Sequence, residues 1–228
     1  MFKIAAHRGG NSWASLYDAI RKGYDFVELD VHLSHDNYLI VQYSPKVYID
    51  GRDIYIKDLC YAELPDGHKK SLILLSDIFT EAKGNIDIII DIKCISSWYS
   101  DIEIRIANLI REYDFYRNCW VISFNHNYLT KIKEYDQHIN TALMYVGCIS
   151  DEKSYWKRTK ADGVEVCIDY FTADTAENAH KLGLKLIGWC TEDFCELDKL
   201  ISHDTDIITI EQEDRFLNYI KNKRGDIM

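Results

Sequence analysis

Short apolar runs alternate along the chain with longer amphipathic stretches. Most of the runs are rich in Ile and Val and almost wholly apolar, as expected for parallel strands that are covered on both faces. One of the stretches between them, residues 100–113, places its isoleucines and leucine at helical spacing and leaves its charges on the other face. The eight runs that we interpret as strands span residues 2–7, 25–33, 86–93, 119–125, 140–146, 163–169, 185–191 and 206–212.

Eight strands that alternate with helices predict an α/β protein with a (β/α)₈ TIM barrel. A doubly wound open sheet is the alternative arrangement of the same elements, but the strand count favours closure. The chain has 228 residues, of which 47% are hydrophobic, and no long polar tract. These values are typical of one domain with a full core, so we expect residues 1–228 to form a single barrel domain.

Residues 34–72 interrupt this alternation. They contain the extended run 38–44, many polar residues and both prolines of the chain, Pro45 and Pro65. A second strand that continues through a turn at Asp36 and Asn37 into this run would form a hairpin. We therefore predict a hairpin and loop insertion after the second strand, at the end of the barrel where insertions commonly cap the active site.

Charge and cysteine content exclude some classes of function. The formal net charge is −10, and the basic residues are scattered, so nucleic acid is not expected as a partner. An anionic substrate would need a local cation, and a divalent metal on carboxylates is the usual one. The seven cysteines form no C-x-x-C pair and are typical of reduced core thiols. No apolar stretch is long enough for a signal peptide or a transmembrane segment, which predicts a cytoplasmic location. The oligomeric state stays open.

Polar residues at the ends of the first two strands are the first candidates for chemistry. The first strand ends in His7 and Arg8, followed by two glycines that let the backbone pass close to a bound group. On the second strand Glu28 and Asp30 are two residues apart and therefore share a face. That face should be the lumen, because the apolar residues between and beside them take the face that helices cover.

The third strand repeats this pattern and completes a candidate metal site. Asp91 and Lys93 share a parity, and the isoleucines around them share the other. Three carboxylates, Glu28, Asp30 and Asp91, could hold Mg²⁺ or Ca²⁺ in the lumen. A salt bridge between the second-strand acids and Arg8 is the structural alternative. Lys93, at the strand end, could meet a phosphate oxygen.

Several motifs together resemble one known family. They are AHRGG at the start, VELDVHLSHDNYLIV after it, IDIK on the third strand, then SFN at 123–125 and IGWCTED near the end. In this combination and order the chain resembles the glycerophosphodiester phosphodiesterase family over nearly its whole length. The resemblance implies the barrel, a divalent metal on Glu28, Asp30 and Asp91, catalytic roles for His7 and Arg8, and a substrate-binding role for Trp189.

The chain departs from the family pattern at three places. The second catalytic histidine of the family falls on Tyr43, in the pair Tyr43-Ser44. The family's Pro-Glu-Asn-Thr segment is reduced to residues 10–12, in which an Asn and a hydroxyl survive. The last strand ends in Glu211 where the family typically has Asp after Thr. The first departure removes a general acid or base, a loss that typically costs about 10²–10⁴ in rate.

Three residues could replace the absent histidine. Tyr43 can donate a proton. His32 has the parity of the second-strand acids and could project into the upper lumen, although a solvent-facing position on the hairpin is the competing interpretation. His126, after the SFN segment, is a further candidate.

The predicted function is metal-dependent cleavage of a small phosphodiester, such as a glycerophosphodiester, to an alcohol and a phosphomonoester. His7 would be the acid or base, and Arg8 and Lys93 would hold phosphate oxygens. Three alternatives use the same scaffold: a catalytically silent barrel that binds a phosphodiester, a cyclising transfer, and cleavage of esters whose leaving group needs no strong acid. The alcohol groups and the identity of the metal stay open.

Overall fold

Eight parallel strands close into a barrel in the computed structural model, which describes residues 2–93, 98–191 and 193–226. Closure is direct, because Ala5 of the first strand lies opposite Phe26 of the second strand and Thr209 of the last. An open doubly wound sheet is thereby excluded, and the predicted (β/α)₈ barrel is confirmed. The barrel strands are β1 (Lys3–Ala6), β2 (Phe26–Leu33), β7 (Asp87–Ile92), β8 (Cys119–Ser123), β9 (Asn140–Tyr145), β10 (Gly163–Cys167), β11 (Lys185–Thr191) and β12 (Ile207–Ile210).

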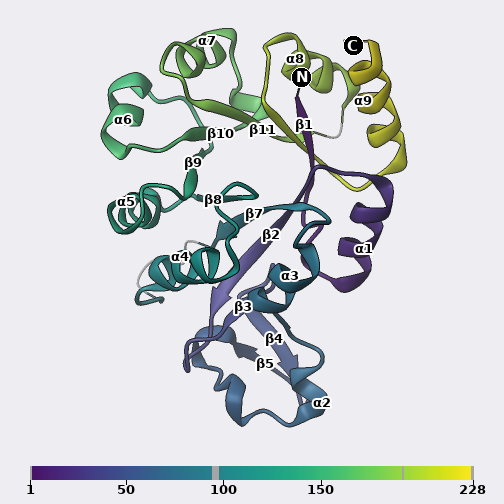
Figure 1. Cartoon of the computed structure of the whole chain (residues 1–228), viewed down its shortest axis with the longest axis vertical. Helices are drawn as coiled ribbons and strands as arrows, with labels where there is room; N and C mark the ends of the chain where they lie inside the picture. Colours follow the sequence, from purple (N-terminus) through teal and green to yellow (C-terminus); the bar gives the residue numbers. More distant parts are fainter. Residues whose placement is uncertain (1, 94–97, 192, 227–228) are drawn as a thin grey trace.

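Helices surround the strands (Figure 1). Several begin at a side chain that caps the first turn: Ser12, Thr172 and Asp193 each accept a hydrogen bond from a backbone N–H of the helix that follows. The helical spacing noted in residues 100–113 is confirmed. The outer helices are α1 (Trp13–Lys22), α3 (Leu75–Ala82), α4 (Ile102–Tyr113), α5 (His126–Tyr135), α6 (Glu152–Thr159), α7 (Ala173–Lys181), α8 (Phe194–Ser202) and α9 (Asp214–Asp226).

The alternation of side chains along each strand separates two apolar cores. One lies between strands and helices and includes Val27, Leu29 and Val31 of β2 together with the even-numbered isoleucines of β7. The other fills the floor of the lumen, where Ala5 and Phe26 meet residues from the neighbouring strands. The predicted assignment of the two faces of the second strand is therefore confirmed. The polar side chains between this floor and the carboxyl ends of the strands are therefore the candidates for catalysis or binding.

The insertion after β2 is larger than the predicted hairpin. Its first strand, β3 (Leu39–Val41), pairs antiparallel with β2, as expected. The sequence did not indicate the second hairpin or the separate small core beneath it, which includes Ile40 and Ile56. Figure 1 shows this part projecting from one side of the barrel. Its remaining elements are β4 (Lys46–Ile49), β5 (Arg52–Tyr55), the 3₁₀ helices η1 (Ile56–Asp58) and η2 (Tyr61–Glu63), α2 (Asp66–Lys69) and β6 (Ile73–Leu74); a further 3₁₀ helix, η3 (Ile168–Tyr170), follows β10.

The described cysteines are all free thiols, but the expectation of core positions is only partly met. Cys119 is buried, whereas Cys148 and Cys195 are exposed. The side chains of Cys94 and Cys190 lie outside the described residues. Within the described ranges, no helix combines the length and the apolar character that a membrane crossing requires.

Candidate active site

A cavity of about 220 Å³ opens at the carboxyl ends of the barrel strands. Barrels of this kind carry their active sites at that end. The cavity brings together seven of the residues singled out from the sequence and four that were not assigned a role there. Its lining consists of His7, Arg8, Glu28, Tyr43, Asp91, Lys93, Phe124, Met144, Glu165, Trp189 and Thr209.

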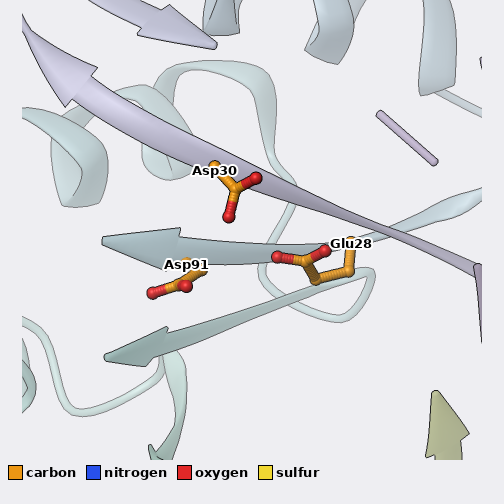
Figure 2. A group of neighbouring side chains, drawn as sticks. All are labelled: Glu28, Asp30 and Asp91. Carbon is orange, nitrogen blue, oxygen red and sulfur yellow. The ribbon is translucent and has the colours of Figure 1, made fainter. Parts of the chain in front are cut away.

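Three buried carboxyl groups gather at one side of this cavity; Glu28 and Asp91 line it, and Asp30 lies beside them. Figure 2 shows Glu28 and Asp30 from β2 and Asp91 from the adjacent β7, with their carboxyl groups facing a shared space. Each residue offers one oxygen such that all three atoms lie within 4.8 Å of one another, and no side chain is more than 4% exposed. Oδ1 of Asp91 has no hydrogen-bond partner among the described residues. An oxygen-only, buried and strongly acidic donor set fits a hard divalent cation such as Mg²⁺ or Ca²⁺.

The pKa values reflect the cost of bringing these acids together. Burial, and then the charges of Asp30 and Asp91, raise the pKa of Glu28 well above its usual value. Burial likewise raises the pKa of Asp91 to about 6, against the opposing effect of Lys93. A cation among the three carboxylates would reverse these shifts, because it favours the ionised forms.

Two basic residues border the acidic group. Lys93 forms ion pairs with Asp30 and Asp91. Burial alone would lower the pKa of Lys93, but the charges of these two acids hold it above its usual range. The backbone N–H of Arg8 donates to Glu28 Oε2 at 2.7 Å, while its guanidinium Nε is 3.9 Å from Asp30. The salt bridge considered as a structural alternative is therefore a long one, and the Arg8 side chain stays 42% exposed.

The shortened segment after β1 still positions an acid. Asn11 Nδ2 donates to Asp30 Oδ2 at 2.5 Å, and its Oδ1 accepts from the backbone N–H of Asp30 at 3.0 Å. The backbone passes close enough for this because residue 10 is glycine: a Cβ there would lie 2.7 Å from a methyl carbon of Leu29. The Asn that survives from the family segment thus fixes the orientation of one carboxyl group of the site.

His7, which directly precedes Arg8 and lines the cavity, is paired with Glu211. Its Nδ1 is 2.5 Å from Glu211 Oε1, although the two residues are 204 positions apart in the sequence. Closure of the barrel brings them together, since β1 and β12 are neighbours. The sequence drew attention to Glu211 only as a departure from the family, and no role was predicted for it. A carboxylate on one ring nitrogen fixes which nitrogen of the imidazole carries the proton.

The candidates for the absent histidine lie in different surroundings. Tyr43 lines the cavity, is 54% exposed, and its ring is stacked on the guanidinium of Arg8 at 3.6 Å. His32 is only 1% exposed, so the solvent-facing interpretation is wrong. Its ring is held between the hydroxyl of Tyr99 and the backbone oxygen of Tyr43, and burial lowers its pKa to about 4. It is not among the residues that line the cavity.

His126 is not positioned for proton transfer in this cavity. Its two ring nitrogens contact the hydroxyl of Tyr155 at 2.5 Å and the backbone oxygen of Met144 at 2.7 Å. Burial lowers its pKa. Both nitrogens serve packing between α5, α6 and β9, so His126 is not placed at the site.

The wall formed by β10, β11 and β12 contains Glu165 and Thr209, two of the four lining residues to which the sequence assigned no role. Glu165 is 2% exposed and lines the cavity. Burial, and then the charge of Asp91, raise its pKa to about 8. Trp189, which was predicted to bind substrate, lies on the next strand and meets Phe124 edge to face. The one charged residue within the otherwise apolar run at 163–167 was the signal that could have identified Glu165.

The comparison with family models identifies the chain. Residues 5–212 match the model of the glycerophosphoryl diester phosphodiesterase family. A glycerophosphodiester phosphodiesterase of Caldanaerobacter subterraneus subsp. tengcongensis is 24% identical over 96% of this chain and 97% of its own length.

Solved structures agree in fold. A glycerophosphodiester phosphodiesterase from Parabacteroides distasonis superimposes with a TM-score of 0.78 at 22% identity, over 98% of both chains. An Oleispira antarctica phosphodiesterase, solved with the product sn-glycerol-3-phosphate, reaches a TM-score of 0.83 at 17% identity, over 96% of both chains. With the family match extending from β1 to the residues just after β12, the chain belongs to the glycerophosphoryl diester phosphodiesterase family and is a phosphoric diester hydrolase.

Proposed function

We propose that this protein is a divalent-metal-dependent glycerophosphodiester phosphodiesterase that cleaves its substrate to an alcohol and a phosphomonoester. The observation that carries the proposal is the acidic group of Glu28, Asp30 and Asp91, two members of which line one cavity with His7, Arg8 and Lys93. The family match and the relatives of the same name support the substrate class.

The three carboxylates would hold Mg²⁺ or Ca²⁺. When bound, the metal would offset negative charge on the phosphoryl oxygens. Lys93 lies against two of the three carboxylates, so its ammonium is within reach of a phosphate that approaches the metal. Arg8 adds a second positive charge at the exposed side of the cavity. Both basic side chains would therefore bind and orient the phosphodiester.

His7 is the proposed acid or base. Nδ1–H donates a hydrogen bond to Glu211, and we assign to Nε2 the role of taking a proton from the attacking water. Glu211 acts through His7 and is a positioning residue. This arrangement resembles the way in which a buried carboxylate orients a catalytic imidazole in other hydrolases.

Tyr43 is the proposed donor to the leaving alkoxide. A phenol O–H is a proton donor, and the Tyr43 ring lies in the cavity, stacked on Arg8. The stack offers a second role, because it holds the guanidinium over the site. Trp189 is proposed to contact the substrate from the opposite wall.

Phosphorus NMR of the reaction mixture tests this proposal and separates its alternatives. Purified protein is incubated with glycerophosphocholine, with glycerophosphoethanolamine and with a nitrophenyl phosphodiester, each with Mg²⁺, with Ca²⁺ and with chelator. His7→Ala is the control. The expected result is metal-dependent release of a phosphomonoester that the control lacks. A cyclic phosphate would identify transfer instead of hydrolysis, and binding of the diester without any new phosphorus species would contradict catalysis.

A further inference from the structure

Three neighbouring residues on the wall of the cavity across from the acidic group each carry a buried polar atom without a hydrogen-bond partner. Oε2 of Glu165, Nε1 of Trp189 and Oγ1 of Thr209 are all buried, and none has a partner in the part of the chain that the structure describes. The three residues lie on β10, β11 and β12, which are neighbours in the sheet, and all three line the cavity. Glu165 and Thr209 are 2% and 1% exposed.

Such atoms are costly unless something in the cavity satisfies them. A buried polar group without a hydrogen bond destabilises a protein, so a ligand that supplies the missing hydrogen bonds is expected to bind at this wall. On the opposite wall, Arg8, Asn11 and Lys93 contact the carboxyl groups, and the one oxygen there that lacks a partner among the described residues, Asp91 Oδ1, belongs to the proposed metal site. Glu165 is buried, and burial raises its pKa to about 8, which favours the carboxylic acid form that can both donate and accept a hydrogen bond.

The hydrogen-bonding character of this wall matches an alcohol more closely than a charged group. A neutral carboxylic acid and a threonine hydroxyl each donate and accept, and an indole N–H donates. A hydroxyl group has the same dual character. A quaternary ammonium and a plain alkyl group have no hydrogen-bond donor or acceptor, so either one would leave all three atoms unsatisfied.

We propose that Glu165, Thr209 and Nε1 of Trp189 form the subsite that recognises the hydroxyl groups of a polyol on one side of the phosphodiester. The phosphate would lie toward the acidic wall, and the polyol would span the cavity to β10–β12. The proposal rests on the proposed function, because it assigns the alcohol part of the same substrate. These residues would determine substrate specificity, because a substrate without hydroxyl groups would leave their polar atoms unpaired.

Two substrates that differ only in hydroxyl groups test this assignment. Glycerophosphocholine and propyl phosphocholine share the phosphate and the choline, and the second lacks both free hydroxyls of the glycerol. The measured quantity is the ratio of kcat/KM for the two substrates. Wild-type protein is expected to prefer the glycerol compound by about 10²-fold or more, since a site built to bind hydroxyls is left unpaired by the analogue.

The variants are chosen to change single atoms. Thr209→Val replaces the hydroxyl with a methyl group, and Glu165→Leu removes the carboxyl; each is expected to reduce the preference by roughly 3- to 10-fold, the effect of one neutral hydrogen bond. Glu165→Gln keeps a donor and an acceptor and should keep most of the preference. The matched control is Thr205→Val, because the Thr205 hydroxyl is also buried and without a partner in the described chain but is not part of the cavity lining.

A binding measurement keeps the subsite testable if turnover fails. Calorimetric titration with sn-glycerol 3-phosphate and with propyl phosphate should give the same preference and the same loss in Thr209→Val. An unchanged ratio in both Thr209→Val and Glu165→Leu, by turnover and by binding, would overturn the subsite while leaving the phosphodiesterase proposal intact. Absence of turnover in wild-type protein, with the preference in binding retained, would contradict the phosphodiesterase proposal and leave the subsite standing.

Discussion

The two walls of the cavity stabilise their buried acids in different ways. On the β2–β7 wall, three carboxyl groups lie together and are contacted by Lys93, by the Arg8 backbone and by Asn11. On the β10–β12 wall, Glu165 is buried, and its Oε2 contacts none of the described donors or acceptors. The β2–β7 wall concentrates negative charge near positive charge. On the β10–β12 wall, burial favours the uncharged form of Glu165.

This difference suggests a division of labour within one substrate. Concentrated carboxylates beside two basic side chains fit a metal and the phosphate that it attracts. Neutral groups with unmet hydrogen bonds fit uncharged hydroxyls. The net charge of −10 would repel an anionic substrate, so the phosphate should bind where a metal and basic side chains supply local positive charge.

Removal of one carboxylate from the acidic wall should have the largest effect. Asp91→Asn takes one ligand from the proposed metal site, and we expect kcat to fall by about 10³-fold or more with a parallel loss of Mg²⁺ or Ca²⁺ affinity. Steady-state kinetics and calorimetric metal titration measure the two effects. Asp87→Asn is the matched control, because Asp87 lies on the same strand but contacts Lys3 and Asn118 at the other end of the barrel. Equal losses in both variants would mean that the strand, and not the site, had been damaged.

His7→Ala should remove acid–base catalysis and leave the metal site. We expect kcat to fall by about 10²–10³-fold, within the range for such a group, while metal affinity changes less than 2-fold. Glu211→Gln should give a smaller loss in kcat, because the ring remains but its orientation is no longer fixed. If His7→Ala abolished metal binding as well, the assignment of acid–base catalysis to His7 and of metal binding to the three carboxylates would be wrong.

Two substitutions of Tyr43 distinguish its two proposed roles. Tyr43→Phe keeps the ring on Arg8 and removes the proton donor, whereas Tyr43→Ala removes both. If Tyr43 is the acid, Tyr43→Phe should slow cleavage of a glycerophosphodiester at least 10²-fold and spare the nitrophenyl ester, whose leaving group needs no acid. If the ring only holds Arg8, Tyr43→Phe should be nearly silent, and Tyr43→Ala should cost about 10-fold, mainly in KM. Rates for the two esters, compared between the variants, decide between them.

The smallest predicted effect is a dependence of stability on pH that comes from Glu165. Its pKa is raised to about 8 in the folded protein, so the folded state retains a proton that the unfolded state loses near pH 4.5. Folding is therefore favoured by this group at low pH, and the benefit disappears as pH rises from about 4.5 to 8. Compared with Glu165→Gln in chelator, wild-type protein should lose stability over this window with a slope of at most about 1.4 kcal/mol per pH unit. Urea unfolding at several pH values measures this slope, and parallel curves for the two proteins would contradict a neutral Glu165.

Much of the barrel and of the acidic wall could be predicted, because both depend on short-range periodicity. Alternation along β2 was enough to place Glu28 and Asp30 in the lumen, and repetition on β7 added Asp91. The pairing of His7 with Glu211 depends on closure between the first and last strands, which spacing in the sequence does not reveal. The second hairpin of the insertion was missed because its strands are only four residues long and carry mixed polarity.

The position of His32 shows the same limit. Parity placed it on the lumen side of β2, but whether it reached the cavity depended on the insertion and on Tyr99, a residue 67 positions away. Glu165 was overlooked for a related reason. Its strand was interpreted as an ordinary apolar strand, and only the assembled lumen shows that one acid in it faces the cavity.

Turnover measured against added metal tests the central claim most directly. The protein is stripped with chelator, freed of the chelator and titrated with Mg²⁺ or Ca²⁺ while glycerophosphodiester cleavage is followed in wild type and in Asp91→Asn. The account predicts no activity in the stripped wild type, activity that rises with metal bound to the Glu28–Asp30–Asp91 group, and a titration curve shifted to much higher metal in the variant. Full activity of the stripped protein, or the same metal dependence in Asp91→Asn as in wild type, would contradict a catalytic metal held on this wall.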